Sequence, residues 1–393
     1  MMLVVATALA ARPPVQPGLD LKTFVVGVFP YDHVLFEDPD CACVEPAAQG
    51  LTDLRLKLDE RRGRFAIEAH HTATFATADV DLAGQTGVAR RAPQLVDGTW
   101  NAVDARQMSL AGRVDRLNLQ VTVPHVDLTL GRQAISFGRA FFFSPLDLVT
   151  PFDPSIVDQE YRPGVDAART DVWLGTAGQV AAVVAWMGDP GDDLVREHLT
   201  ATGYAQGTLG LWDLGAFGGL VRADPVLGAV AAGSAGPLGL RSEATVTLVD
   251  DPFVRASAGA DWMPMPDLYL SAELYLQTLG ADGPDDYLTQ ALDPRYVVGE
   301  LWLLGQRYAG VSASWKVHPL WTVGTGAIAN LGDPSVLLMP SIEGSVSDEV
   351  SLTASGFVGL GERPPDWSTS APAFASEFGS WPSAFFLALK VYA

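Results

Sequence analysis

The six histidines are the first side chains to test for chemistry, and their spacing assembles no metal or catalytic site. His70 and His71 are adjacent in a segment with strand periodicity, so their side chains should point to opposite faces of a sheet. No two histidines show the helical H-E-x-x-H spacing of a zinc protease. The other four fall in predicted turns or loops: His33, His125, His198 and His318.

Cys41 and Cys43 are the only cysteines, with one residue between them. A disulfide here would close a small strained ring, and two sulfurs are too few for a structural zinc site by themselves. The spacing favours a loop disulfide or two small unpaired residues, with a metal site as the alternative. The side chains that could complete such a site are Asp38, Asp40, Glu45 and His33.

The sequence also contains no recognisable motif for catalysis or for phosphate binding. The glycines of GAFGGL, residues 215–220, lie inside a strand pattern with no helix after it, so they do not form a phosphate loop. No nucleophile, base and orienting residue fall together. We therefore predict no catalytic residues, no metal site, no cofactor and no enzymatic activity. The 46 acidic and 25 basic residues, a net charge of −21, also argue against a nucleic-acid partner.

The elements that position these residues show a period of two. In LRLKLDERRGRFAIEAHHTATF, residues 54–75, Leu54, Leu56 and Leu58 alternate with charged residues, and the alternation resumes after a turn at Gly63. Such a pattern predicts a hairpin of half-buried strands. It recurs along the chain in segments of about 9 to 13 residues, which is long for soluble strands and right for tilted membrane-spanning strands.

About seventeen segments of this kind can be placed, joined by tight turns and long connections in alternation. The long connections are 76–113, 139–167, 188–202, 279–305 and 361–381. Short periplasmic turns and long extracellular loops are typical of outer-membrane barrels, which normally have an even number of strands. The segment 21–29 supplies the missing strand. We predict an all-β fold, a transmembrane antiparallel β-barrel of about eighteen strands, with sixteen as the alternative.

The start of the chain resembles an export signal. MMLVVATALA has a short apolar core and an A-x-A pattern at residues 8–10, although no positive charge precedes the core. We predict a signal peptide over residues 1–10 and one barrel domain over 11–393; a disordered or buried N-terminus is the alternative. No apolar run approaches the roughly 18 residues of a spanning helix.

Three stretches carry a family resemblance: GRQAISFG at 131–138, the acidic, proline-containing FSPLDLVTPFDPSIVDQEYRPGVDAAR that follows, and NLGDPSVLLMPSIEGSVSDEVSLTASG from Asn330. They resemble porin-like outer-membrane proteins of Gram-negative bacteria, of the alginate-export or general porin type. The likeness covers about half the chain, and its motifs are structural. The ending FFLALKVYA resembles a terminal assembly strand but departs from it by ending in Ala393, after an aromatic Tyr392.

If the apolar faces meet lipid, the polar faces line the lumen. The alternation slips between Leu130 and Ile135, which predicts a bulge near Gly131 that turns Arg132 inward. If the connection 139–167 folds into the barrel, its charges form an eyelet; the alternative is that they pair and pin the loop to the wall. The predicted pore-lining and constriction residues are Arg132, Arg139, Asp147, Asp153, Asp158, Glu160, Arg162, Asp166, Arg169, Asp171, Arg116, Arg241, Glu243, Arg255 and Glu273.

These features predict a porin or channel for passive diffusion of small hydrophilic solutes or ions across the outer membrane of a Gram-negative bacterium. Ion preference stays open, because an acidic vestibule would concentrate cations while inner arginines would bind anions. The predicted partners are the lipid bilayer, lipopolysaccharide, small solutes or ions, and further copies of the chain or a partner chain. The alternatives are a plugged barrel that acts as adhesin or scaffold, and a secreted soluble β-rich binding protein.

Overall fold

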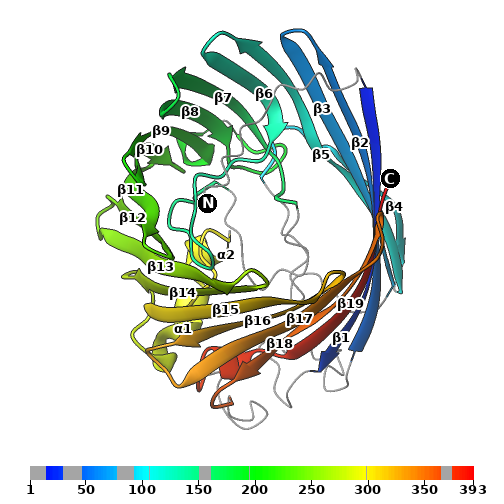
Figure 1. Ribbon diagram of the computed structural model, residues 1–393, viewed down its shortest axis with the longest axis vertical. Coiled ribbons are helices and arrows are strands. Elements are labelled where there is room, and N and C mark those ends of the chain that lie inside the picture. Colours follow the sequence, from blue (N-terminus) through cyan, green and yellow to red (C-terminus); the bar gives the residue numbers. More distant parts are fainter. Residues whose placement is uncertain are drawn as a thin grey trace.

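One antiparallel sheet forms the body of the protein and closes on itself into a ring (Figure 1). The computed structural model describes residues 15–29, 47–77, 93–105, 107–149, 161–193, 195–297, 299–363 and 374–393. Most of this part of the chain is strand, because the period-two segments place apolar side chains on one face and polar side chains on the other. No helix among the described residues is long and apolar enough to cross a membrane.

The strands follow one another around the ring, and the few helices lie in the connections. The strands are β1 (Val15–Phe29), β2 (Ala47–Arg62), β3 (Phe65–Thr77), β4 (Thr99–Ala105), β5 (Met108–Val123), β6 (Val126–Gln133), β7 (Val165–Leu174), β8 (Gly178–Trp186), β9 (Leu199–Leu209), β10 (Trp212–Val221), β11 (Asp224–Ala235), β12 (Leu238–Thr247), β13 (Phe253–Met265), β14 (Leu268–Gln277), β15 (Arg307–His318), β16 (Trp321–Asn330), β17 (Ser335–Ser347), β18 (Val350–Leu360) and β19 (Ser383–Tyr392). The described helices are η2 (Arg196–His198), η3 (Pro284–Asp286), α1 (Tyr287–Ala291), α2 (Pro294–Val297) and η4 (Phe378–Ser380).

Closure of the ring depends on β1, which pairs with β2 on one edge and with β19 on the other. The closed ring contains eighteen strands, β1–β3 and β5–β19. Every strand of the ring therefore has a partner on both sides, which lets the backbone be satisfied without water. The predicted all-β barrel of eighteen strands is confirmed, and the segment 21–29 is indeed part of a strand, β1.

The nineteenth strand, β4, lies outside the ring and was not predicted. It pairs only with β5, with Thr99 opposite Arg113 and Ala105 opposite Met108. This edge of β5 is free because β6 ends at Gln133 and pairs no further than Leu117 of β5. The segment lies inside the predicted connection 76–113, and its seven residues, TWNAVDA, show no clear alternation.

The outward face of the barrel is apolar and exposed. Leu117 and Leu274 are 56% and 60% exposed, whereas their neighbours Asn118 and Glu273 are 4% and 2% exposed. A large contiguous apolar surface is unfavourable in water and marks contact with a membrane or another apolar partner. Because the outward leucines are exposed rather than packed beneath a second sheet, the fold is that of a membrane barrel and not of a soluble sandwich.

Indole rings gather at the rim that carries the tight turns. Trp262, Trp315 and Trp321 are exposed next to these turns, where indole rings anchor at a membrane interface. Trp173 and Trp212 occupy equivalent places beside the β7–β8 and β9–β10 turns. Trp186 is instead buried against His198 near the other rim.

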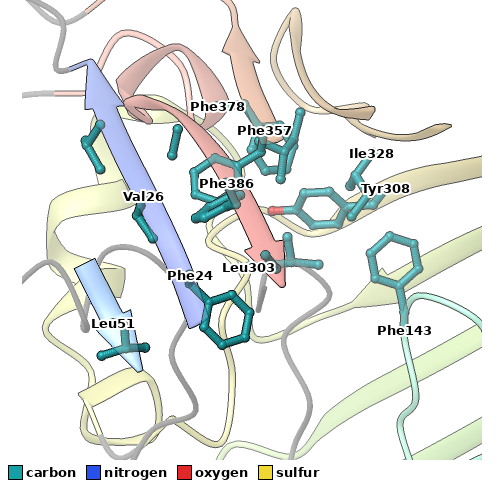
Figure 2. Packing of buried hydrophobic residues seen from close by; sticks show 14 of the residues in the cluster. Phe24, Val26, Leu51, Phe143, Leu303, Tyr308, Ile328, Phe357, Phe378 and Phe386 are labelled. Atoms are coloured by element: carbon teal, nitrogen blue, oxygen red, sulfur yellow. The ribbon is translucent and has the colours of Figure 1, made fainter. Parts of the chain in front are cut away.

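Two apolar clusters fill part of the barrel interior. In the aromatic cluster, Phe24 and Phe386 of the inner wall pack with Phe378 and Phe143 from the connections, as Figure 2 shows, and Tyr308 lies among them. The ring centroids of Phe143 and Tyr275 are 5.0 Å apart and nearly parallel. The second, aliphatic cluster is formed by Ile135, Leu146, Leu148, Val165 and Val183 with their neighbours. Both clusters hold connecting segments inside the ring.

Candidate pore constriction

Two carboxylates of the inner wall anchor the segment 139–149 inside the barrel. Glu243 on β12 accepts hydrogen bonds from the backbone N–H groups of Arg139 and Ala140, and from the Ser144 hydroxyl at 2.7 Å. Glu273 on β14 accepts the N–H groups of Phe141 and Phe143 at 2.7 and 2.9 Å. These bonds satisfy backbone donors that the loop could not pair within itself, so they fix its path.

The far end of the same connection is held by cations on β1 and β2. The ring of Tyr161 lies 4.0 Å from Cζ of Arg55 and 4.6 Å from Nζ of Lys22, and its hydroxyl donates to Asp20 at 2.6 Å. Nζ of Lys57 forms an ion pair with the same Asp20 at 2.6 Å. Cation–π contacts of this kind stabilise an aromatic ring against a polar wall.

The connection 139–167 therefore contacts opposite sides of the ring, β12 and β14 at one end and β1 and β2 at the other. Figure 1 shows coil segments inside the ring of strands. The two described parts of this connection, residues 139–149 and 161–167, both lie against the inner wall, as expected of a connection that folds into the lumen. Of the predicted eyelet, Asp153, Asp158 and Glu160 lie outside the described residues.

Most of the remaining predicted residues form ion pairs. Nη2 of Arg162 lies 2.8 Å from Asp147, and Arg169 forms two hydrogen bonds with Asp171 at 2.7 and 2.8 Å. The others form these pairs: Arg139 with Asp213, Arg241 with Asp261, and Arg116 with Asp115. Of these pairs, the one between Arg139 and Asp213 joins the connection to the wall, and the one between Arg162 and Asp147 joins two parts of the connection.

Arg132 and Asp166 lie on the outward face of the barrel. Arg132 pairs in register with the outward Leu117, and no register shift interrupts β6 at Gly131. The alternation is therefore unbroken, and Arg132 points away from the lumen. It binds Asp166 through Nε and Nη2 at 3.0 and 2.9 Å, while Asp166 also accepts the N–H group of Leu95 at 2.8 Å. The pair holds residues 93–98, which we call the outer strap.

Gly131 has a structural role in this arrangement. Its φ is +111°, a conformation that L side chains rarely adopt, and a Cβ there would lie 2.3 Å from the carbonyl oxygen of Leu117. The residue that suggested a bulge is thus a close-packed glycine in a continuous ladder.

Arg255 on β13 differs from the other predicted arginines. It is 3% exposed, its Nη2 donates to the carbonyl of Pro145 at 3.4 Å, and its Nε has no hydrogen-bond partner. Within the described residues no carboxylate lies at ion-pair distance from it. The side chain lines a cavity of about 80 Å³ that is partly open to solvent. The cavity wall also includes Phe141, Phe142, Phe143, Tyr275, Gln277, Glu300, Trp302 and Leu303.

The buried carboxylate of Glu377 joins its own connection to residues at the extracellular ends of β15 and β16, near this cavity. Glu377, 1% exposed, accepts hydrogen bonds from the Tyr308 hydroxyl, the Asn330 amide and the N–H group of Leu304, at 2.5, 2.7 and 2.7 Å. Burial raises the pKa of Glu377 to about 7, because the charged form loses its hydration. The protonation state of Glu377 therefore affects the hydrogen bonds that hold the segment beginning at residue 374 in place.

Several site residues escaped the sequence analysis. Asp20 and Lys22 alternate with Leu19 and Leu21, so the period-two signal could have found both: Lys22 lies inside the predicted strand 21–29, and Asp20 lies just before it. Asp115 sits at a register shift between β3 and β5 that turns it inward beside Arg116. Tyr161 had no local signal, because its role depends on the path of the connection.

Comparisons with known proteins agree on the architecture. No protein-family profile matches the chain, and no curated protein sequence matches it. Among solved structures, Acinetobacter baumannii OccAB4 superposes with a TM-score of 0.58 at 6% identity over 98% of this chain and 99% of that one. The chain has a porin fold. Pseudomonas aeruginosa OpdK, solved with vanillate, and a BenF-like porin from Pseudomonas fluorescens Pf-5 each give 0.56 at 10% identity, over 96% of this chain and 98% of theirs. At such identities the likeness establishes the porin fold and no more.

Proposed function

We propose that the protein is an outer-membrane channel of a Gram-negative bacterium through which small hydrophilic solutes diffuse passively. The closed barrel, its apolar outward face and its polar inner wall support a water-filled path. The connection held at both walls would set the narrowest point, where pore radius and lining charge select the solute. Transport of this kind requires no reaction and no cofactor.

The observation that carries a solute preference is the buried side chain of Arg255, which has no carboxylate partner among the described residues. A buried guanidinium without a carboxylate partner is stabilised when an anion enters its cavity, because the anion replaces lost hydration. The aromatic rings of Phe143, Tyr275 and Trp302 line the same cavity and suit a flat apolar group. One solved porin of the same fold holds vanillate, an aromatic carboxylate. We therefore propose small carboxylates, aromatic ones included, as the preferred solutes.

The test is the reversal potential of the purified protein in a planar bilayer under a salt gradient. The wild type should favour anions at the constriction, and Arg255→Gln should shift the potential toward cations and weaken block by benzoate. Arg196→Gln, in an exposed extracellular helix, is the matched control and should leave both unchanged. An unchanged potential in Arg255→Gln would overturn the carboxylate preference and leave diffusion itself standing.

Reconstitution also separates the channel from the plugged barrel. The two apolar clusters occupy part of the interior. A plugged barrel that acts as adhesin or scaffold would show no conductance, whereas the proposed channel gives stable open steps.

We also propose that the outward face contacts lipopolysaccharide on the side opposite the tryptophan-rich rim. The number of chains in the native assembly is measured by light scattering in detergent; we propose that the barrel associates with further copies through its outward face.

A further inference from the structure

Three potential metal ligands meet on the inner wall close to the β2–β3 turn. Asp59 lies on β2, and Glu68 and His70 lie on β3, all with side chains on the face that carries the buried Arg55 and Thr72. Nε2 of His70 is 3.2 Å from a carboxylate oxygen of Asp59 and 3.7 Å from one of Glu68. One donor atom from each residue lies within 4.8 Å of the others.

The two carboxylates of this group lie close together, and the cations on the adjacent strands form their ion pairs with other carboxylates. Asp59 and Glu68 stand directly opposite each other in the β2–β3 ladder, where like charges are destabilising. The cations that face His70 from the adjacent strands are Lys57 and Arg116, and they are bound to Asp20 and Asp115 respectively. Within the described residues, neither Asp59 nor Glu68 has a lysine or arginine at ion-pair distance.

His70 is the second observation that points to a ligand. The residue is 7% exposed, its Nε2 points between the two carboxylates, and its Nδ1 has no hydrogen-bond partner in the part of the chain that the structure describes. Nδ1 is the ring nitrogen remote from the two carboxylates, so Nε2 is the ligand atom that His70 offers to this group. The Asn118 amide donates to the second oxygen of Glu68 at 2.7 Å and orients that carboxylate, as outer partners of metal ligands do.

We propose that Asp59, Glu68 and His70 bind a divalent transition-metal ion of the Zn²⁺ class inside the barrel, near the mouth that carries the tight turns. One imidazole nitrogen and two carboxylate oxygens form a ligand set for zinc that leaves further positions to water. Ligands about 2.0–2.2 Å from zinc lie about 3.3 Å from one another, so the two distances from His70 already fit. The imidazole excludes Mg²⁺ and Ca²⁺ as preferred ions, because these bind oxygen ligands.

This site goes beyond the proposed function and does not depend on it. The ion would join β2 to β3 and place two positive charges on the lumen wall, at the foot of the row formed by Arg55 and Lys57. This site could not be predicted from sequence, because the three residues belong to no spaced motif and meet only through strand register.

The experiment is a calorimetric titration of ZnCl₂ into the untagged full-length barrel in detergent near neutral pH. The background carries Cys41→Ser and Cys43→Ser, so that zinc bound by those thiols does not contribute. We expect one site per chain, and MgCl₂ should not compete. His70→Ala should weaken the affinity by more than about tenfold. His71→Ala is the matched control, since His71 faces outward and stacks on Trp100, and it should bind as the parent does.

Folding of each variant is checked by its heat-dependent mobility in SDS gels. If His70→Ala does not fold, Asp59→Asn and Glu68→Gln keep the side-chain size and should each lower the affinity. Absence of zinc binding in the parent, or equal affinity in His70→Ala and His71→Ala, would overturn the proposed site. Neither result requires the barrel to conduct, so failure here is distinct from failure of the channel proposal.

Discussion

At the residue scale, the ion pair between Arg132 and Asp166 should stabilise the outer strap. The two side chains are 5% and 18% exposed, and removing one partner from a buried pair typically costs about 3 kcal/mol or more. Asp166→Asn should therefore lower the free energy of unfolding and speed proteolysis within residues 93–98. Asp213→Asn, which removes the more exposed partner of Arg139, should cost less than about 1 kcal/mol.

The same variant tests which face these residues occupy. Because Arg132 and Asp166 are in register with the outward Leu117, Asp166→Asn should leave the reversal potential of the channel unchanged. A clear shift in ion selectivity would instead mean that the pair borders the lumen, as the sequence suggested.

Single residues could be assigned to a face wherever alternation was unbroken. Glu243, Arg255 and Glu273 were placed inward from sequence, and the structure has them there, because strand periodicity fixes the direction of each side chain. Arg132 was placed inward because a bulge was expected near Gly131, and the β5–β6 ladder has no register shift at that position. The partners of Glu243 lie about a hundred residues away in the chain, so no local pattern could identify them.

At the element scale, the segment 374–381 should respond to pH through Glu377. Its pKa of about 7 in the folded protein is raised from an ordinary carboxyl value near 4.3, so the folded state holds the proton more tightly. The resulting stabilisation is fully present below about pH 4.3 and is lost as the pH rises through about 7, by roughly 3 kcal/mol. Glu377→Gln should remove this dependence.

The measurement is the thermal midpoint of the detergent-solubilised protein between pH 5 and pH 8. The wild type should lose stability over this range relative to Glu377→Gln, while Glu349→Gln, in an exposed turn, should follow the wild type. Parallel curves for wild type and Glu377→Gln would show that the carboxyl group keeps one protonation state throughout.

Elements were predictable from sequence to different degrees. The ring strands were found because each must alternate over its full length to present one face to lipid and one to water. β4 was missed because a short strand that pairs on one edge only needs no such alternation. The inward folding of the connections rests on aromatic contacts such as Phe143 with Tyr275, which join distant parts of the chain.

At the scale of the whole molecule, the decisive property is the apolar outward face, and its depth in the bilayer can be tested directly. Leu274 is outward and lies well within β14, whereas Leu238 begins β12 beside a tight turn. Leu274→Arg should cost about 2–4 kcal/mol of unfolding free energy in lipid vesicles, because the charge must enter hydrocarbon. Leu238→Arg should cost about 0–1 kcal/mol, because the guanidinium reaches the interface. Urea titration of the vesicle-inserted protein measures both, and equal costs at the two positions would contradict a membrane that covers this face.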